Sequence, residues 1–164
     1  MGELAYVRRY APGEEMLLLE VFRSAVRLIA SCDYMPEQVE AWAPRNLDLA
    51  AWQARIRGLN PFVAVLGGDL VGYADIQPTG YVDHFYVSGH HPRRNIGSLL
   101  MMRLLEEAVS LGLSVLTSDV SVTAQPLFAK FGFSVVERRN TQILGVVMPN
   151  VLMSCNLESA LTCV

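Results

Sequence analysis

The spacing of hydrophobic and polar residues divides the chain into short segments of alternating helical and extended character. In some segments the apolar residues recur every three to four positions, which is typical of helices with one buried face. In others, short apolar runs are bounded by Gly, Pro, Asn and Asp, which is typical of strands. We expect helices over 14–30, 36–42, 49–57, 96–110 and 123–131. We expect strands over 4–10, 61–66, 70–77, 81–87, 113–120, 134–140 and 146–157.

Turn residues indicate how the central strands pair. Gly67-Gly68-Asp69 joins two apolar runs, and a short turn of this composition is a strong hairpin signal. Pro78-Thr79-Gly80 then leads directly into strand 81–87, so this strand should pair with the one before it in an antiparallel meander. The order of elements predicts an α/β (α+β) protein, with a mixed sheet covered by helices.

Composition excludes several classes of protein. The chain has 164 residues, of which 52% are hydrophobic and 18% charged, so we expect one ordered domain over 1–164. No apolar stretch approaches the roughly 18 residues of a membrane span, and MGELAYVRRY contains no apolar signal core, which favours a cytoplasmic protein. A net charge of −3 argues against a nucleic-acid surface. Three widely spaced cysteines (Cys32, Cys155 and Cys163) fit reduced thiols.

Candidate chemistry concentrates where strand 81–87 leads into helix 96–110. The first turn of a helix has unpaired N–H groups and the positive end of the helix dipole, which together attract phosphates. Gly97 would let a ligand approach this backbone closely, and Arg93 and Arg94 add positive charge just before it. Taken alone, the same residues fit an ordinary strand-to-helix loop equally well.

Several motifs, in the right order and spacing, resemble one family. Tyr-Val-Asp-His-Phe-Tyr-Val at 81–87, Pro-Arg-Arg-Asn-Ile-Gly at 92–97 and Phe-Ala-Lys-Phe-Gly-Phe at 128–133 are similar to motifs of the GNAT acyltransferases, with further similarity to a stand-alone bacterial subgroup. These enzymes transfer an acetyl group from acetyl-coenzyme A (acetyl-CoA) to an acceptor, usually an amine. The resemblance covers nearly the whole chain and implies one GNAT domain, whose largely antiparallel central sheet has about six to seven strands flanked by helices.

The resemblance also implies a binding site for acetyl-CoA. The main chain of Phe85, Tyr86 and Val87 should bind the pantetheine arm. The pyrophosphate should be bound by the loop amides of Arg93, Arg94, Asn95, Ile96, Gly97 and Ser98. Ser121 should contact the arm, and Phe128 should pack near the sulfur. Pro92 departs from the family motif and removes one donor. Asn95 replaces a motif glycine, and asparagine tolerates positive φ better than most residues.

Asp83 is the candidate catalytic base. An amine of pKa ~10 is mostly protonated at pH 7, so its acylation needs a group that removes a proton. Strand alternation would place Asp83 and Phe85 on one face and His84 on the other, and His84 is interpreted as a surface or core residue. In the alternative interpretation, Asp83 pairs with an arginine or binds an ammonium group without taking its proton. Asp75 and Asp119 are second-choice carboxylates.

The acceptor site is indicated less directly. Tyr34 and Trp42 lie on the early segments that, in this family, wall the acceptor, and a cleft carboxylate in an acidic protein favours a small cationic amine. Phe128 occupies the place of the tyrosine that is often the general acid, so no side-chain acid is assigned. Adjacent His90 and His91 do not have ligand spacing, and no metal is expected.

Two other functions remain open from the sequence. Pro92, Asn95 and Phe128 leave open a GNAT-fold protein that binds or senses an acyl-CoA without catalysis. The early helices also leave open a homodimer interface.

Overall fold

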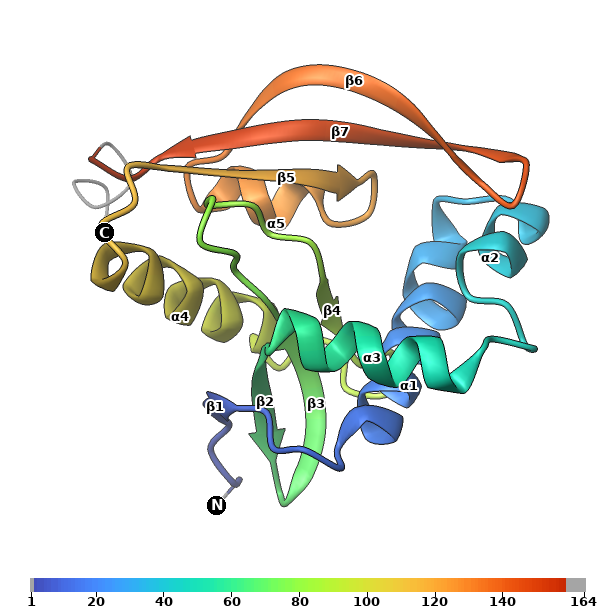
Figure 1. Cartoon of the computed structure of the whole chain (residues 1–164), viewed down its shortest axis with the longest axis horizontal. Coiled ribbons are helices and arrows are strands. Elements are labelled where there is room, and N and C mark those ends of the chain that lie inside the picture. The colour runs from blue at the N-terminus through green and yellow to red at the C-terminus, as the bar shows by residue number, and fades with distance from the viewer. Residues whose placement is uncertain (1, 159–164) are drawn as a thin grey trace.

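The chain, described here over residues 2–158 in a computed structural model, folds around two antiparallel sheets (Figure 1). The first sheet has the order β1-β2-β3-β4, and the second has the order β5-β7-β6. The strands are β1 (Tyr6–Arg9), β2 (Phe62–Leu66), β3 (Asp69–Ala74), β4 (Phe85–Val87), β5 (Val115–Ser121), β6 (Ser134–Ile143) and β7 (Val146–Asn156).

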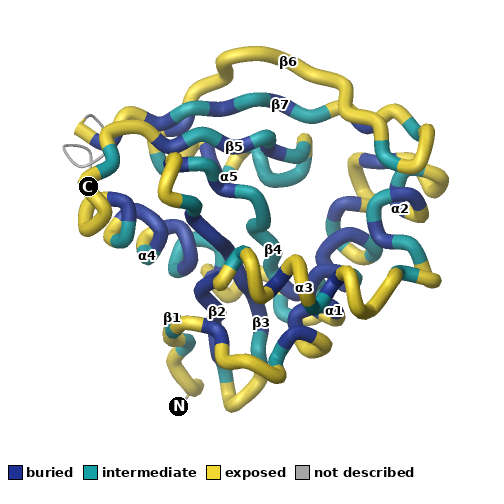
Figure 2. Tube along the Cα trace, viewed as in Figure 1, coloured by how far each residue is buried: buried dark blue, intermediate teal, exposed yellow. Residues whose placement is uncertain are grey.

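Helices cover both faces of the first sheet (Figure 2). Alternation along β2 sends Val63 and Val65 to a core shared with α1 and α3, and Phe62 and Ala64 to a core shared with α4. The helices are α1 (Glu15–Ser24), α2 (Pro36–Trp42), α3 (Leu49–Leu59), α4 (Ile96–Ser110) and α5 (Gln125–Lys130). None of the helices described is long and apolar enough to cross a membrane.

The predicted α/β class is confirmed, and the details differ in two places. The sheet is divided in two, and strand 81–87 narrows to β4, with Tyr81 forming a separate parallel bridge to Thr117 of β5. Helix 14–30 divides into α1, a π-helical turn over Ala25–Ile29 and a 3₁₀ turn over Ala30–Cys32. The sequence pattern predicts strand 81–87 and helix 14–30, but it does not predict where the hydrogen-bonding pattern changes within each.

A buried carboxylate lies where the two sheets part. Asp75 follows β3, and its side chain Oδ1 accepts hydrogen bonds from the main-chain N–H groups of Asp83 (3.0 Å) and His84 (2.6 Å). The Asp75 N–H also donates to the His84 carbonyl at 3.1 Å, so this side chain holds the chain before β4 beside the end of β3. The Val82 N–H donates to the Thr117 carbonyl at 2.8 Å, so the same segment also bonds to β5. β4 and β5 therefore diverge from this shared segment.

The β6–β7 hairpin closes the far side of the second sheet. β6 is an edge strand and is largely exposed (Figure 2). Asn150 of β7 lies opposite Ser121 of β5 on one side and opposite Arg139 of β6 on the other. Residues opposite one another in a ladder share a face of the sheet, so these three side chains lie on the same face.

Candidate functional site

Four neighbouring cavities follow the divergence of β4 and β5. The α4 cavity, about 460 Å³, surrounds residues 91–98 at the start of α4. The wedge cavity, about 200 Å³, lies along β4 and shares Ile29, Val87 and Leu127 with it. The inner cavity (about 60 Å³) holds Asp83, and the hairpin cavity (about 120 Å³) reaches the β6–β7 hairpin. Trp42 and Tyr86 line all three of the latter cavities.

The backbone before α4 is shaped for an anion. Arg93 (φ 59°) and Asn95 (φ 57°) are left-handed on either side of Arg94, and such an alternation turns successive N–H groups to one side. The first intrahelical bond runs from the Leu99 N–H to the Asn95 carbonyl at 3.1 Å, and the Asn95 side chain does not cap the helix. The amides at 96–98 therefore precede the helical ladder and face the cavity without a cap. Asn95 has the positive φ that was expected of it.

Positive side chains surround these amides. Arg93, Arg94 and Lys130 line the α4 cavity, and none of the three forms an ion pair within residues 2–158. Three cations without a carboxylate partner at a helix N-terminus favour a polyanionic ligand. Lys130 was not predicted as a site residue, because only the packing of α5 brings it to this cavity.

Gly97 lies where the side chain of Leu127 from α5 closely approaches the start of α4. A Cβ atom at this position would lie 2.7 Å from Leu127 Cδ2 and 3.7 Å from Val87 Cγ2. The start of α4 thus packs against both α5 and β4, and this packing fixes where the α4 cavity meets the wedge cavity.

The outer edge of β4 has unused hydrogen-bonding groups. Tyr86 lies opposite Tyr73, and its carbonyl points toward β3, 3.2 Å from where a Cβ of Gly72 would be. In an antiparallel strand the neighbours of such a residue direct their N–H and C=O groups the other way. The main chain of Phe85 and Val87 therefore faces the wedge, whereas Tyr86 reaches the cavities with its side chain. This differs from the prediction, which included the Tyr86 main chain.

Asp83 lines the inner cavity and pairs with Arg55 of α3. Its side chain is 27% exposed, and its own N–H is held by Asp75. The arginine pair is one of the two alternatives considered for Asp83, while its role as a base stays a prediction. The sequence did not indicate Arg55, because nothing in the spacing of helix 49–57 connects it with residue 83.

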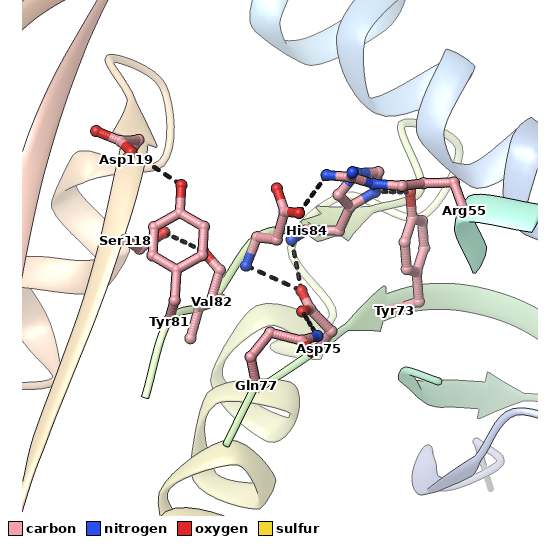
Figure 3. Close-up of polar contacts among 10 residues, drawn as sticks. Arg55, Tyr73, Asp75, Gln77, Tyr81, Val82, His84, Ser118 and Asp119 are labelled. Atoms are coloured by element: carbon pink, nitrogen blue, oxygen red, sulfur yellow. Dashed lines mark hydrogen bonds and ion pairs between the residues drawn. The ribbon is translucent and has the colours of Figure 1, made fainter. Parts of the chain in front are cut away.

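His84 belongs to an aromatic cluster beneath the site. Its ring packs near Phe22, Trp52 and Tyr86, and its Nδ1 lies 3.0 Å from the Tyr73 hydroxyl (Figure 3). Burial lowers the pKa of His84 to about 4, because the cluster disfavours the charged ring. Of the two interpretations left open for His84, surface or core, the aromatic contacts favour the core.

Phe128 forms the apolar end of the inner cavity. It is 1% exposed and packs edge-to-face on Phe85 and Phe133, with ring centroids 5.2 and 4.9 Å apart. No hydroxyl is available at this position. Ser121, at the end of β5, lines the wedge, inner and hairpin cavities. Its Oγ accepts a hydrogen bond from the Ala124 N–H at 3.1 Å.

The predicted acceptor residues do form a wall. Tyr34 and Trp42 both line the hairpin cavity and pack edge-to-face with centroids 5.3 Å apart. The Tyr34 hydroxyl donates to the Pro149 carbonyl (2.7 Å) and accepts from the Val122 N–H (2.9 Å). The Trp42 indole N–H donates to the Tyr86 hydroxyl at 3.2 Å. These bonds fix the orientation of both rings.

Asp119 is the second carboxylate at the cavities. It accepts a hydrogen bond from the Tyr81 hydroxyl at 2.8 Å (Figure 3) and pairs with Arg139 at 3.1 Å. Burial raises the pKa of Tyr81 to about 12, so this hydroxyl stays protonated as a donor. Asp75, the other second-choice carboxylate, is buried and structural, as described above. Within residues 2–158, no three His, Cys, Asp or Glu side chains gather as metal ligands would.

A cationic cavity at the start of a helix is the donor site that the resemblance to the GNAT acyltransferases implies. Residues 30–151 match the family model described as an acetyltransferase (GNAT) domain. The chain is 31% identical over 147 residues to the uncharacterized N-acetyltransferase YafP of Escherichia coli K12, covering 90% of this chain and 93% of that protein. The chain therefore belongs to the GNAT family of acetyltransferases.

Solved structures agree with this assignment. A GCN5-related N-acetyltransferase from Rhodopseudomonas palustris superposes with a TM-score of 0.89 at 29% identity, over 95% of this chain and 98% of that one. The acetyltransferase yncA from Salmonella typhimurium, solved with acetyl-CoA, has the same fold, with a TM-score of 0.69 at 20% identity and 94% of each chain covered.

Proposed function

We propose that this protein transfers the acetyl group of acetyl-CoA to a small, cationic amine by direct attack. The observation that carries the proposal is the α4 cavity, where backbone amides meet three cations that have no ion-pair partner among residues 2–158. The α4 cavity shares lining residues with the wedge cavity, so a ligand with an anionic head in the first could extend an arm into the second. The protein yncA has the same fold and was solved with acetyl-CoA, which supports the same choice of donor.

The residues fit this donor part by part. The amides at 96–98, with Arg93, Arg94 and Lys130, would bind its phosphates. The outward main-chain groups of Phe85 and Val87 would bind its amide-containing arm as a further strand does. Phe128 would pack near the sulfur.

The chemistry needs little more than positioning and one proton acceptor. Acetyl-CoA supplies a thioester, whose carbonyl carbon the amine nitrogen attacks. The C–N bond forms, the C–S bond breaks, and the coenzyme leaves as a thiolate that takes its proton from water. The N–H of Val87 would hydrogen-bond the carbonyl oxygen as it gains charge. Asp83, held in place by Arg55, would receive the proton from the amine, directly or through water.

A thiol-release assay tests the proposal. Purified protein with acetyl-CoA and a panel of amines should release thiol faster than acetyl-CoA alone, and calorimetry should detect acetyl-CoA binding. Replacing both Arg93 and Arg94 by Gln should weaken that binding at least tenfold. Replacing both Arg138 on exposed β6 and exposed Arg45 by Gln removes the same charge away from the α4 cavity and serves as the control. No heat with acetyl-CoA would refute the proposal.

The alternative function is an acyl-CoA-binding or sensing module, favoured by Pro92 and Phe128. Tight binding of acetyl-CoA without thiol release for any amine would support it. A homodimer through the first helices stays a prediction, which light scattering of the purified protein would test.

A further inference from the structure

The side chain of Tyr86 lies where three of the cavities meet. Its main chain pairs with Tyr73 in the first sheet, so Tyr86 lines the wedge, inner and hairpin cavities with its side chain. The ring packs against Phe22 and His84, with centroids 4.9 and 5.5 Å apart. The hydroxyl at its tip lies 3.2 Å from the indole nitrogen of Trp42, which lines the same three cavities. The hydroxyl therefore lies at their common border.

The fold uses the oxygen of this hydroxyl but not its proton. An indole N–H can only donate, so the Tyr86 oxygen is the acceptor in its bond with Trp42. The hydroxyl proton has no acceptor among residues 2–158. Burial raises the pKa of Tyr86, because the surroundings disfavour the phenolate, so the hydroxyl keeps its proton at neutral pH. A ligand in these cavities would therefore meet an oriented donor without a partner.

The inner cavity has few other donors among the described residues. The Ser118 hydroxyl donates to a main-chain carbonyl at 2.7 Å, and Asp83 and Asp119 bring carboxylates, which accept hydrogen bonds. The Ser121 hydroxyl is the other one whose proton has no acceptor in this part of the chain, but a serine hydroxyl rotates freely. The ring packing and the indole bond fix the Tyr86 hydroxyl, and a preorganised donor stabilises developing charge best.

The proposed reaction develops such a charge in this place. When the C–N bond forms and the C–S bond breaks, the electron pair of the C–S bond goes to sulfur. An arm bound along β4 would bring that sulfur into the inner cavity, where Phe128 and Tyr86 both form part of the wall. The carboxylates of Asp83 and Asp119 line the same cavity and would repel a thiolate, so a neutral donor is needed there.

We propose that the Tyr86 hydroxyl is a catalytic hydrogen-bond donor, which stabilises the coenzyme thiolate as it leaves. The O–H group bonds to the sulfur and keeps its proton, and the thiolate then takes a proton from water. Tyr86 thereby supplies a donor that Phe128 cannot supply. The proposal rests on the proposed function, since it names a further residue of the same reaction.

The thiol of bound coenzyme A tests the proposal without any acceptor amine. Its titration is followed by the ultraviolet absorbance of the thiolate, with the complex of desulfo-coenzyme A as the blank that cancels the protein's own tyrosines. A donor to the thiolate lowers the pKa of the thiol, so the bound thiol should titrate about one pH unit higher in Tyr86→Phe than in wild type. The charged pairs Asp83–Arg55 and Asp119–Arg139 are present in both proteins, so their influence cancels in the comparison.

Two further variants assign the effect to one hydroxyl. Tyr73→Phe is the matched control, because it removes a hydroxyl that bonds to His84 in the same aromatic cluster and lines none of the four cavities. Its complex should titrate as wild type does, and a shift equal to that of Tyr86→Phe would overturn the proposal. A shift in Ser121→Ala with none in Tyr86→Phe would overturn it as well.

The chemical step gives a second measurement. With an amine that wild type acetylates, Tyr86→Phe should lower the single-turnover rate of acetyl transfer about tenfold and keep the wild-type affinity for desulfo-coenzyme A by calorimetry. A merely structural hydroxyl would instead weaken that affinity, and this result would overturn the proposal. Coenzyme A that binds wild type and Tyr86→Phe with the same thiol titration would overturn this inference alone, whereas no binding to wild type would refute the proposed function.

Discussion

Mild acid should destabilise the fold through His84. The ring is neutral in the folded protein because its pKa is lowered from 6.5 to about 4, whereas in the unfolded chain it binds a proton below about 6.5. The stability gained by keeping the ring neutral is therefore complete above pH 6.5 and is lost progressively as the pH falls toward 4.

The size of the effect follows from these two pKa values. At pH 5, the unfolded ring is about 97% protonated and the folded ring about 9%, which corresponds to about 2 kcal/mol of lost stability relative to pH 7.5. This figure is an upper value, because water reaches part of the ring. Against typical total stabilities of about 5–15 kcal/mol, it is a large fraction.

Urea unfolding at pH 7.5 and pH 5.0 measures the effect. His84→Asn keeps a polar atom toward the Tyr73 hydroxyl but does not titrate. The variant therefore removes the contribution of His84 protonation to the pH dependence and keeps that of the carboxylates. Wild type should lose up to about 2 kcal/mol more than His84→Asn between the two pH values. His90→Asn, at an exposed histidine, should behave as wild type. Equal losses in wild type and His84→Asn would refute the account of a desolvated ring.

Three further substitutions test other parts of the structure. Asp83→Asn should lower turnover about 100-fold if Asp83 receives the proton, and an unchanged pH–rate profile by thiol release would argue against that role. Asp48→Ala removes the Asp48 Oδ1 acceptor of the Ala51 N–H (3.1 Å) at the start of α3 and should cost about 1 kcal/mol in urea unfolding. Asp75→Ala leaves two buried N–H groups without their acceptor, so it should cost about 2–5 kcal/mol and weaken acetyl-CoA binding measured by calorimetry; a stable variant with normal affinity would contradict the role given to this carboxylate.

Much of the fold follows from local signals. Helix periodicity placed α4 at its observed bounds, and the turn residues between β2 and β3 indicated their hairpin correctly. Asn95 could be anticipated because its left-handed conformation is a property of one residue in one loop. The family motifs also depend on local sequence, so the resemblance predicts a ligand site at the start of α4.

The remaining features depend on contacts between distant segments. Arg55 and Asp83 are 28 residues apart, and only the tertiary fold brings α3 to the segment before β4. The hydrogen bonds that Asp75 accepts from Asp83 and His84 join a side chain to backbone eight and nine residues away, which a strand pattern does not indicate.

The position of the cations has a consequence for turnover under the proposed function. Arg93, Arg94 and Lys130 surround the α4 cavity, whereas Asp83 lines the inner cavity. They would therefore hold spent coenzyme as firmly as fresh donor, because the phosphates are the same before and after reaction. Departure of the product would then limit the steady-state rate, and accumulating coenzyme would compete with its acetylated form.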